Sequence, residues 1–280
     1  MSERSAKPFL KWAGGKQQLL KQFEPYLPAC YARYLEPFLG GGALFFHLWN
    51  TQRLPAEVCL FDTNHELVNV YNAVRNELEL LIDCLRVHQN RHSHDYYYAI
   101  RGLDRQPDVQ LNQIEKAART IYLNKTCYNG LYRVNSKGQF NVPLGSYKNP
   151  PILQEEILRQ ASAALQAVQI EQRDFRTLSQ VTQPNDFIYF DPPYDPVSKT
   201  ASFTSYTAGS FTDADQRELA ETYAALAQKG CFCMLSNSHT PLVLELYSRF
   251  RIASVHASRA INSKASGRGA IQEALVLNYP

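Results

Sequence analysis

Asp191, Pro192 and Tyr194 stand together in a four-residue turn, Asp191-Pro192-Pro193-Tyr194, directly after the apolar run FIYF. The two prolines keep the backbone extended and stiff, so the turn displays a carboxylate, a main-chain carbonyl and an aromatic ring side by side. Two such acceptors can hold both hydrogens of an exocyclic amine, while Tyr194 stacks on the planar base that carries it. They would stabilise the positive charge that develops when this poorly nucleophilic nitrogen attacks a methyl cation donor. A plain turn at the end of a strand is the alternative interpretation.

A glycine-rich segment, EPFLGGG over residues 36–42, precedes an amphipathic stretch at 43–50. Consecutive glycines between an extended segment and a helix allow the backbone to approach a ligand closely. Asp62 follows Gly42 by 20 positions and comes directly after the apolar run VCLF, where an acid can accept hydrogen bonds from ribose hydroxyls. The pattern favours a nucleoside site, although a full GxGxxG motif is absent. A tight turn followed by a helix-capping Asp is the alternative.

A third candidate is the N-terminal segment FLKWAGGK, which contains Trp12 and Lys16. Its Gly-Gly-Lys invites comparison with a phosphate-binding loop, but GxxxxGK[ST] is absent and Gln17 follows the lysine. The segment therefore does not indicate a nucleoside triphosphatase. Taken alone, it fits a core tryptophan and a solvated lysine equally well.

Short apolar runs that alternate with helical stretches must position these motifs. Strands are expected at 57–61, 187–190, 231–235 and 274–277, and a helix at 213–228 follows Thr212, a suitable N-cap. This alternation predicts an α/β fold with a mostly parallel sheet. Ligands bind such sheets at the carboxyl ends of the strands, where Asp62, Asp191 and Ser236 fall.

The middle of the chain differs in pattern, because residues 66–123 are mostly helical and residues 124–150 lose periodicity. We therefore expect an insert at 65–148 within a discontinuous domain made of 1–64 and 149–280. Segment 124–150 contains no acid, and neither does segment 246–272; their basic residues are Lys125, Arg133, Lys137, Lys148, Arg249, Arg251, Arg259, Lys264 and Arg268. Such loops favour contact with a phosphate backbone, and two solvated loops without acids are the alternative.

The 280 residues carry a net charge of +3 and a composition typical of a folded globular protein, which excludes collagenous, coiled-coil and disordered classes. No apolar run is long enough to span a membrane, and the N-terminus has no signal-peptide pattern. The six cysteines show no zinc-ligand spacing, so we expect buried free thiols in a reducing cytoplasm.

Together and in this order, the segments resemble the Dam-type DNA adenine methyltransferases, which use S-adenosylmethionine and form the D12 class. The resemblance covers nearly the whole chain. Residues 128–147 are its most specific part, because they are similar to the part of Dam enzymes that recognises GATC. The matching segments are FLKWAGGK, EPFLGGG, NKTCYNGLYRVNSKGQFNVPLGSYK, DPPYDPVSKTASFTSYTAGSFT, LSNS and EALVLNY.

The resemblance implies a Rossmann-like S-adenosylmethionine-dependent methyltransferase fold with an inserted, mainly helical DNA-recognition domain. It implies an adenine-specific, site-specific DNA methyltransferase in which Asp191, Pro192 and Tyr194 are catalytic. Asp62 would bind the ribose of S-adenosylmethionine, and Asp191 would also lie near its methionine part. The cofactor-binding residues would be Trp12, Lys16, Glu36, Pro37, Phe38, Gly40, Gly42, Asp62, Asp174, Phe175 and Asp191; no metal is expected.

The resemblance also assigns contacts with double-stranded DNA. Lys11 would reach the outer guanine, Tyr128 would wedge into the duplex, and Asn129 would fill the vacated space. Arg133 would recognise a guanine and Pro143 would pack on a thymine methyl group. Lys148 would contact a phosphate, and Asn135 and Asn141 would lie near the displaced adenine. The full DNA-binding set is Lys11, Tyr128, Asn129, Leu131, Arg133, Asn135, Asn141, Pro143 and Lys148.

We expect a cytoplasmic monomer that associates with the nucleoid when it binds DNA and serves restriction–modification or DNA replication and repair. Three alternatives remain at this stage. The enzyme could methylate another amine, namely cytosine in DNA, adenine in RNA or a glutamine side chain. The chain could be a DNA-binding protein without catalysis, or a nicotinamide-dependent oxidoreductase, although the last does not explain the Asp191–Tyr194 turn.

Overall fold

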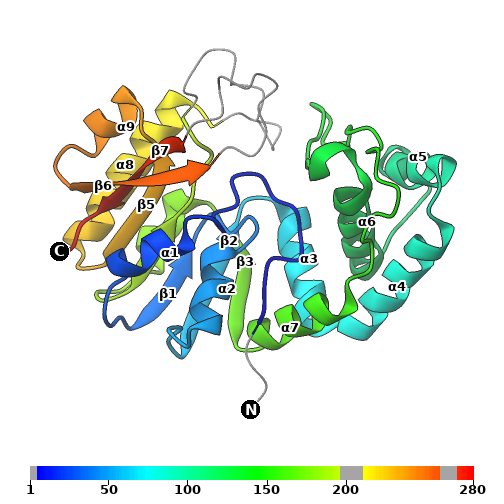
Figure 1. Cartoon of the computed structure of the whole chain (residues 1–280), viewed down its shortest axis with the longest axis horizontal. Coiled ribbons are helices and arrows are strands. Elements are labelled where there is room, and N and C mark those ends of the chain that lie inside the picture. Colours follow the sequence, from blue (N-terminus) through cyan, green and yellow to red (C-terminus); the bar gives the residue numbers. More distant parts are fainter. Residues whose placement is uncertain (1–4, 196–210, 259–269) are drawn as a thin grey trace.

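The computed structural model describes residues 5–195, 211–258 and 270–280, and within them the chain forms a seven-stranded sheet (Figure 1). The strand order is β3-β2-β1-β4-β5-β7-β6. Strands β1 to β5 run parallel, whereas β7 is antiparallel to both β5 and β6. The bounds are β1 Arg33–Glu36, β2 Glu57–Asp62, β3 Val168–Gln172, β4 Phe187–Phe190, β5 Phe232–Ser238, β6 Arg251–Ser258 and β7 Ala270–Leu277.

Helices cover both faces of this sheet, which explains why β4 is apolar and buried at every position. Alternate residues of β4 belong to different cores: Phe187 and Tyr189 pack with helices α2, α3 and α7, while Ile188 and Phe190 pack with α8 and α9. These helices are α2 Ala43–Asn50, α3 His65–Asn76, α7 Glu155–Leu165, α8 Asp213–Gln228 and α9 Pro241–Leu246. The predicted Rossmann-like α/β fold is thereby confirmed.

Local sequence accounts for several element boundaries. The predicted helix at 213–228 is confirmed as α8, and Thr212 caps it by accepting from the Asp215 N–H while Asp215 accepts from the Thr212 N–H. Helix α2 begins directly after the glycine segment, as predicted. The four predicted strands correspond to β2, β4, β5 and β7. Strand β4 has the predicted bounds, β2 and β7 extend beyond theirs, and β5 begins one residue later and ends three residues later than predicted.

Helices α4 Leu78–Arg91, α5 His94–Gly102 and α6 Gln113–Thr126 lie together on one side of the sheet (Figure 1, cyan to green). Helices α5 and α6 share a small core with the segment that follows α6, formed by Tyr97, Tyr122, Leu123, Cys127, Phe140, Val142 and Ile152. The buried residues of α4 belong instead to the main core. Helix α3 packs against β2 and β3 on one side and against α6 on the other. Helix α3 therefore connects the sheet to the helical part. Residue 65 as the start of the insert stays a prediction.

Two expectations need correction. Of the six free cysteines, Cys30, in the segment before β1, is exposed, and Cys84, in α4, is only partly buried. Segment 246–272 is not simply a loop, since it contains β6 and the beginning of β7; residues 259–269, with Arg259, Lys264 and Arg268, lie outside the described residues. Among the helices described, none has the length and apolar character needed to cross a membrane.

Candidate functional site

The site lies where the strand order reverses. Strand β1 is paired with β2 on one side and with β4 on the other, so the connections leave its carboxyl end in opposite directions. Open α/β sheets bind ligands in the crevice outside such a reversal. Glu36 ends β1 and Asp191 directly follows β4, which places the glycine segment and the Asp191–Tyr194 turn at neighbouring strand ends.

Asp191 is held by two side chains from distant parts of the sequence. Lys16 Nζ lies 2.7 Å from Asp191 Oδ1, and Ser236 Oγ, in β5, donates to the same oxygen at 3.1 Å. Burial raises the pKa of Asp191, whereas the Lys16 charge and the two hydrogen bonds oppose this shift. Tyr189 extends the network through a 2.9 Å hydrogen bond with the Ser236 hydroxyl. The carboxylate is thus oriented and kept competent to accept hydrogen bonds.

Tyr194 has a defined environment on its face and at its hydroxyl. The Lys16 ammonium lies 4.4 Å from the ring centroid, a cation–π contact, so one lysine contacts both the carboxylate and the ring of the turn. The Tyr194 hydroxyl donates to a carboxylate oxygen of Glu273, in β7. The sequence motifs predict Lys16 only as part of the cofactor pocket and give Glu273 no role.

The backbone of the turn is fixed by buried amides. Gln216 Nε2, from α8, donates to the Pro193 carbonyl at 3.1 Å, and the Asp195 N–H donates to Asn237 Oδ1 at 3.1 Å. Asn237 and Gln216 are themselves joined by a 3.1 Å hydrogen bond. The motif LSNS contained Asn237, but nothing in the local sequence marked Gln216, whose role depends on how α8 packs.

The glycine segment fits a nucleoside cofactor in its backbone and in its donor set. Gly40 has φ +48°, and its N–H donates to Asp62 Oδ2 at 3.1 Å. A Cβ on Gly40 would lie 2.9 Å from Trp12 Cδ1, so the N-terminal motif packs directly on this loop and only glycine fits there. Asp62 also accepts from the Asn64 N–H at 2.9 Å, and the carboxylate keeps lone-pair capacity for a ribose hydroxyl. Burial raises the pKa of Asp62, which the N–H groups of Asn64, Gly40 and Thr63 oppose.

The remaining predicted cofactor residues surround this loop. Glu36 and Pro37 are buried; Tyr34 donates to Glu36 Oε2 at 2.8 Å, and burial raises the pKa of Glu36 to about 8. Phe38 stacks on Phe175 with ring centroids 5.6 Å apart, so the two rings predicted near the cofactor do meet. Asp174 caps the short helix η4 Phe175–Gln180 by accepting from the Arg176 N–H at 2.9 Å. This carboxylate therefore has a structural role in addition to its predicted role in cofactor binding.

Residues 127–144 fold back on themselves as a hairpin beside α6, which we call the recognition hairpin. Backbone bridges join Cys127 to Leu144 and Val134 to Phe140. At its start Tyr128 is 53% exposed, as a wedge requires, and Asn129 adopts φ +56° beside it. Among the described residues, Tyr128 and Tyr147 are the two aromatic members of the exposed large hydrophobic side chains.

The other predicted DNA contacts, in the recognition hairpin and just after it, differ in exposure and in their hydrogen bonds to the protein. Arg133 is exposed, and its Nε donates to Asn141 Oδ1 at 2.7 Å, which orients the guanidinium. Asn135 accepts from the Lys137 and Gln139 N–H groups at 3.0 Å each, so its side chain holds the turn of the hairpin. Pro143 and Lys148 are exposed and Leu131 is partly exposed.

Lys11 is attached to the recognition hairpin through Asn124, a fully buried residue of α6. The Lys11 N–H donates to Asn124 Oδ1 at 2.9 Å, and Asn124 Nδ2 donates to the carbonyls of Lys11 at 2.7 Å and Gly130 at 3.1 Å. The Lys11 ammonium lies 4.3 Å from the centroid of the Tyr147 ring. The structure therefore brings Lys11 next to the residues that were predicted to contact bases.

Lys125 corrects the charge-based interpretation of segment 124–150. Its side chain is buried at the end of α6, and Nζ donates to Gln154 Oε1 at 2.8 Å. Burial, with the charges of Lys11 and Lys7 contributing, lowers its pKa to about 8. Residues 120–126 are all buried, so the end of α6 is enclosed on every side and Lys125 is not displayed for a phosphate.

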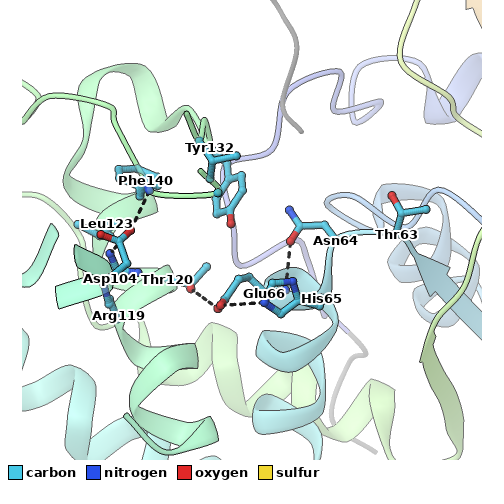
Figure 2. Close-up of a pocket in the computed structure, with 12 residues that line it drawn as sticks. Thr63, Asn64, His65, Glu66, Asp104, Arg119, Thr120, Leu123, Tyr132 and Phe140 are labelled. Atoms are coloured by element: carbon cyan, nitrogen blue, oxygen red, sulfur yellow. Dashed lines mark hydrogen bonds and ion pairs between the residues drawn. The ribbon is translucent and has the colours of Figure 1, made fainter. Parts of the chain in front are cut away.

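A cavity of about 250 Å³ lies between the start of α3 and the recognition hairpin (Figure 2). Asn64, Glu66 and Tyr132 line it, and Tyr132 also stacks on Trp12 with centroids 5.4 Å apart. Asp191 and Tyr194 are not among its lining residues, so it does not hold the reacting groups. Its lining includes Thr63 and Asn64, the two residues that follow Asp62 in the chain.

Comparison with known proteins agrees with these features. Residues 12–261 match the family described as D12 class N6 adenine-specific DNA methyltransferase. The chain is 44% identical to the Type II methyltransferase M1.LlaDCHI of Lactococcus lactis subsp. cremoris, over 98% of this chain and 95% of that one. It is 42% identical to the Type II methyltransferase M.MjaIII of Methanocaldococcus jannaschii (98% and 99%), and 34% identical to a DNA adenine methylase of Vibrio cholerae (99% and 98%).

Proposed function

The chain belongs to the D12 class of N6 adenine-specific DNA methyltransferases, and from this premise we propose that it methylates adenine within GATC after flipping the base out of duplex DNA. The methyl donor is S-adenosylmethionine, which when bound supplies an electrophilic methyl group. Asp191, at the carboxyl end of β4 with Lys16, Ser236 and Tyr194 around it, is the observation that carries the proposal.

The target amine cannot reach a methyl donor while its base is stacked in the duplex, and unstacking costs a few kcal/mol. The exposed Tyr128 ring would occupy the duplex, and Tyr194 would stack on the displaced adenine. Asp191 and the Pro192 carbonyl would accept the two hydrogens of the amine. Because Lys16 Nζ already contacts Asp191 and lies over Tyr194, the incoming base has to replace or share these contacts.

Asp191 would stabilise the positive charge that grows on the amine nitrogen as it attacks the methyl carbon. The bond from that carbon to the sulfonium sulfur would break, S-adenosylhomocysteine would be the leaving group, and the nitrogen would lose its proton to solvent during or after transfer. The cofactor would be held by the loop from Glu36 to Gly42, by Asp62 and by Trp12, with Phe38 and Phe175 nearby. No covalent enzyme intermediate is required. Replacing Asp191 with Ala should abolish methyl transfer, and near-normal turnover would refute its assignment.

The GATC site is proposed from residues 128–147, and Lys11, Arg133 and Pro143 are the proposed base contacts. Residues 65–148 would form the recognition domain, and 1–64 with 149–280 the catalytic domain. We further propose a cytoplasmic monomer. Because two of the relatives are named Type II methyltransferases, a role in restriction–modification is favoured over one in replication or repair.

The test is methyl transfer from S-adenosylmethionine to unmethylated plasmid, followed by cutting with nucleases that are sensitive or insensitive to GATC methylation. Protection only at GATC supports the cofactor, the base and the site together. Transfer without GATC protection keeps the methyltransferase and refutes the site assigned to residues 128–147. The Asp191→Ala variant, assayed in parallel, excludes a contaminating activity.

A further inference from the structure

Glu273 is an acid in the middle of a buried sheet. It lies on β7 opposite Ser238 of β5 on one side and Val255 of β6 on the other. Only 9% of the residue is exposed, and its neighbours along the strand, Ala274 to Leu277, are apolar and buried. A buried carboxylate costs free energy unless it is paired or hydrogen-bonded, so its retention here requires an explanation.

The Tyr194 hydroxyl supplies that explanation. It donates to Glu273, and among the described residues Glu273 has no ion pair and no other side-chain hydrogen-bond donor. Burial raises the pKa of both groups, while the charge of Lys16 opposes this for Glu273. The hydrogen bond gives the buried Glu273 carboxylate a partner, and reduced access of water to Glu273 strengthens it.

The ring and the backbone of Tyr194 are held by different residues. Gln216 and Asn237 form hydrogen bonds with the main chain at Pro193 and Asp195, whereas the Tyr194 side chain contacts Lys16 at its ring face and Glu273 at its hydroxyl. If the Tyr194 hydroxyl had no hydrogen-bond partner, rotation about the side-chain bonds would still move the ring. Glu273 holds the hydroxyl end of the ring from β7, which lies two strands from β4 in the sheet order.

We propose that Glu273 is a positioning residue that fixes the Tyr194 ring in the orientation in which it stacks on the target base. The inference rests on the stacking role proposed above for Tyr194. It predicts that Glu273 acts through the tyrosine hydroxyl alone, and that it affects the methyl-transfer step more than cofactor binding.

The experiment compares full-length enzyme with its Glu273→Ala, Glu273→Gln, Tyr194→Phe and Tyr194→Ala variants and with the Glu273→Ala/Tyr194→Phe double variant. Single-turnover transfer of tritiated methyl groups to bacterial DNA prepared without methylation makes the assay independent of the recognition sequence. Calorimetry gives the dissociation constant of S-adenosylmethionine. Gln272→Ala, an exposed neighbour on β7, is the matched control.

Glu273→Ala should lower the single-turnover rate about tenfold, as expected for a lost hydrogen bond to a charged group. Glu273→Gln keeps an acceptor and should stay within about threefold of the unaltered enzyme. In the Tyr194→Phe background, removing Glu273 should cost less than about twofold, because the shared interaction is already absent. Cofactor binding and the Gln272→Ala rate should not change.

Three results would overturn the proposal: an unchanged rate in Glu273→Ala, equal losses in the Ala and Gln variants, or a full tenfold loss in the Tyr194→Phe background. Equal rates for Tyr194→Ala and the unaltered enzyme would refute stacking itself, and the role of Glu273 with it. A loss in Tyr194→Ala but not in Glu273→Ala would refute only the positioning role.

Discussion

Lys16 Nζ lies 2.7 Å from Asp191 Oδ1, and only 4% of the lysine side chain and 21% of the aspartate side chain are exposed. The pair joins the N-terminal motif to the turn after β4, two segments more than 170 positions apart in the sequence. Burial raises the pKa of Asp191, and Lys16 is the main group that opposes this rise. The ion pair therefore decides over which pH range the carboxylate is charged.

Lys16→Met should move the acid limb of the pH–rate profile to higher pH. Without the ammonium, the pKa of Asp191 rises further, and the charged form that accepts from the amine is lost at a higher pH as acid is added. Single-turnover rates measured from pH 5 to pH 9 at saturating cofactor would show the shift. Lys21→Met, at an exposed position in α1 Leu20–Phe23, is the control, and an unmoved limb in Lys16→Met would contradict the prediction.

Gly130 and Gly138 provide a matched pair for the role of Lys11. Both have positive φ, +66° and +75°, so alanine is strained at either position. A Cβ on Gly130 would lie 2.5 Å from Lys11 Cδ, whereas one on Gly138 meets nothing within 4 Å. Gly130→Ala should weaken binding to GATC duplex about tenfold more than Gly138→Ala, because one base contact is displaced.

Urea unfolding should show that both alanine variants lose about 1 kcal/mol of stability from the backbone strain. Fluorescence anisotropy with a labelled GATC duplex measures the difference in binding. If both variants bind equally well, Lys11 does not contact DNA in the manner proposed.

Lys125 and Lys148 should differ in how their loss changes the salt dependence of DNA binding. Lys148 is exposed, so Lys148→Ala should reduce the slope of log K against log salt by about 0.9, the value for one phosphate contact. Lys125 is buried against Gln154, and Lys125→Met should leave the slope unchanged. Binding titrations at four salt concentrations suffice, and a reduced slope for Lys125→Met would show that the lysine leaves its buried position.

These residues also show what the sequence could predict. The Asp191–Tyr194 turn, the glycine segment and Thr212 were identified because their signals are local: two prolines, adjacent glycines and a capping residue. Gln216, Ser236 and Glu273 were not assigned, since they meet the turn only after α8, β5 and β7 have packed around it.

Charge patterning was less informative than burial. The charge pattern groups Lys125 with the basic residues of segment 124–150, although residues 120–126 at the end of α6 are all buried. Helix phase does not distinguish this lysine, because the helix is enclosed on every side there. For Glu273 the sequence does carry a signal, an acid directly before the apolar run at 274–277, because a carboxylate buried there needs a partner.

Glu36 gives a prediction about stability. Burial raises its pKa to about 8, well above that of an unfolded glutamate, so the folded state binds a proton that the unfolded state releases. Its contribution is therefore fully present below pH 4.5 and is lost as the pH rises to about 8. Between pH 6 and pH 8 the free energy of unfolding should fall by about 2 kcal/mol because of this group.

Glu36→Gln keeps an acceptor for the Tyr34 hydroxyl but does not titrate. Urea unfolding at pH 6 and pH 8 should therefore show a smaller loss of stability in Glu36→Gln than in the unaltered protein. Glu57→Gln, at the exposed start of β2, is the control and should follow the unaltered protein. Equal pH dependence in all three proteins would mean that Glu36 stays charged at the end of β1, in which case its hydrogen bonds outweigh its burial.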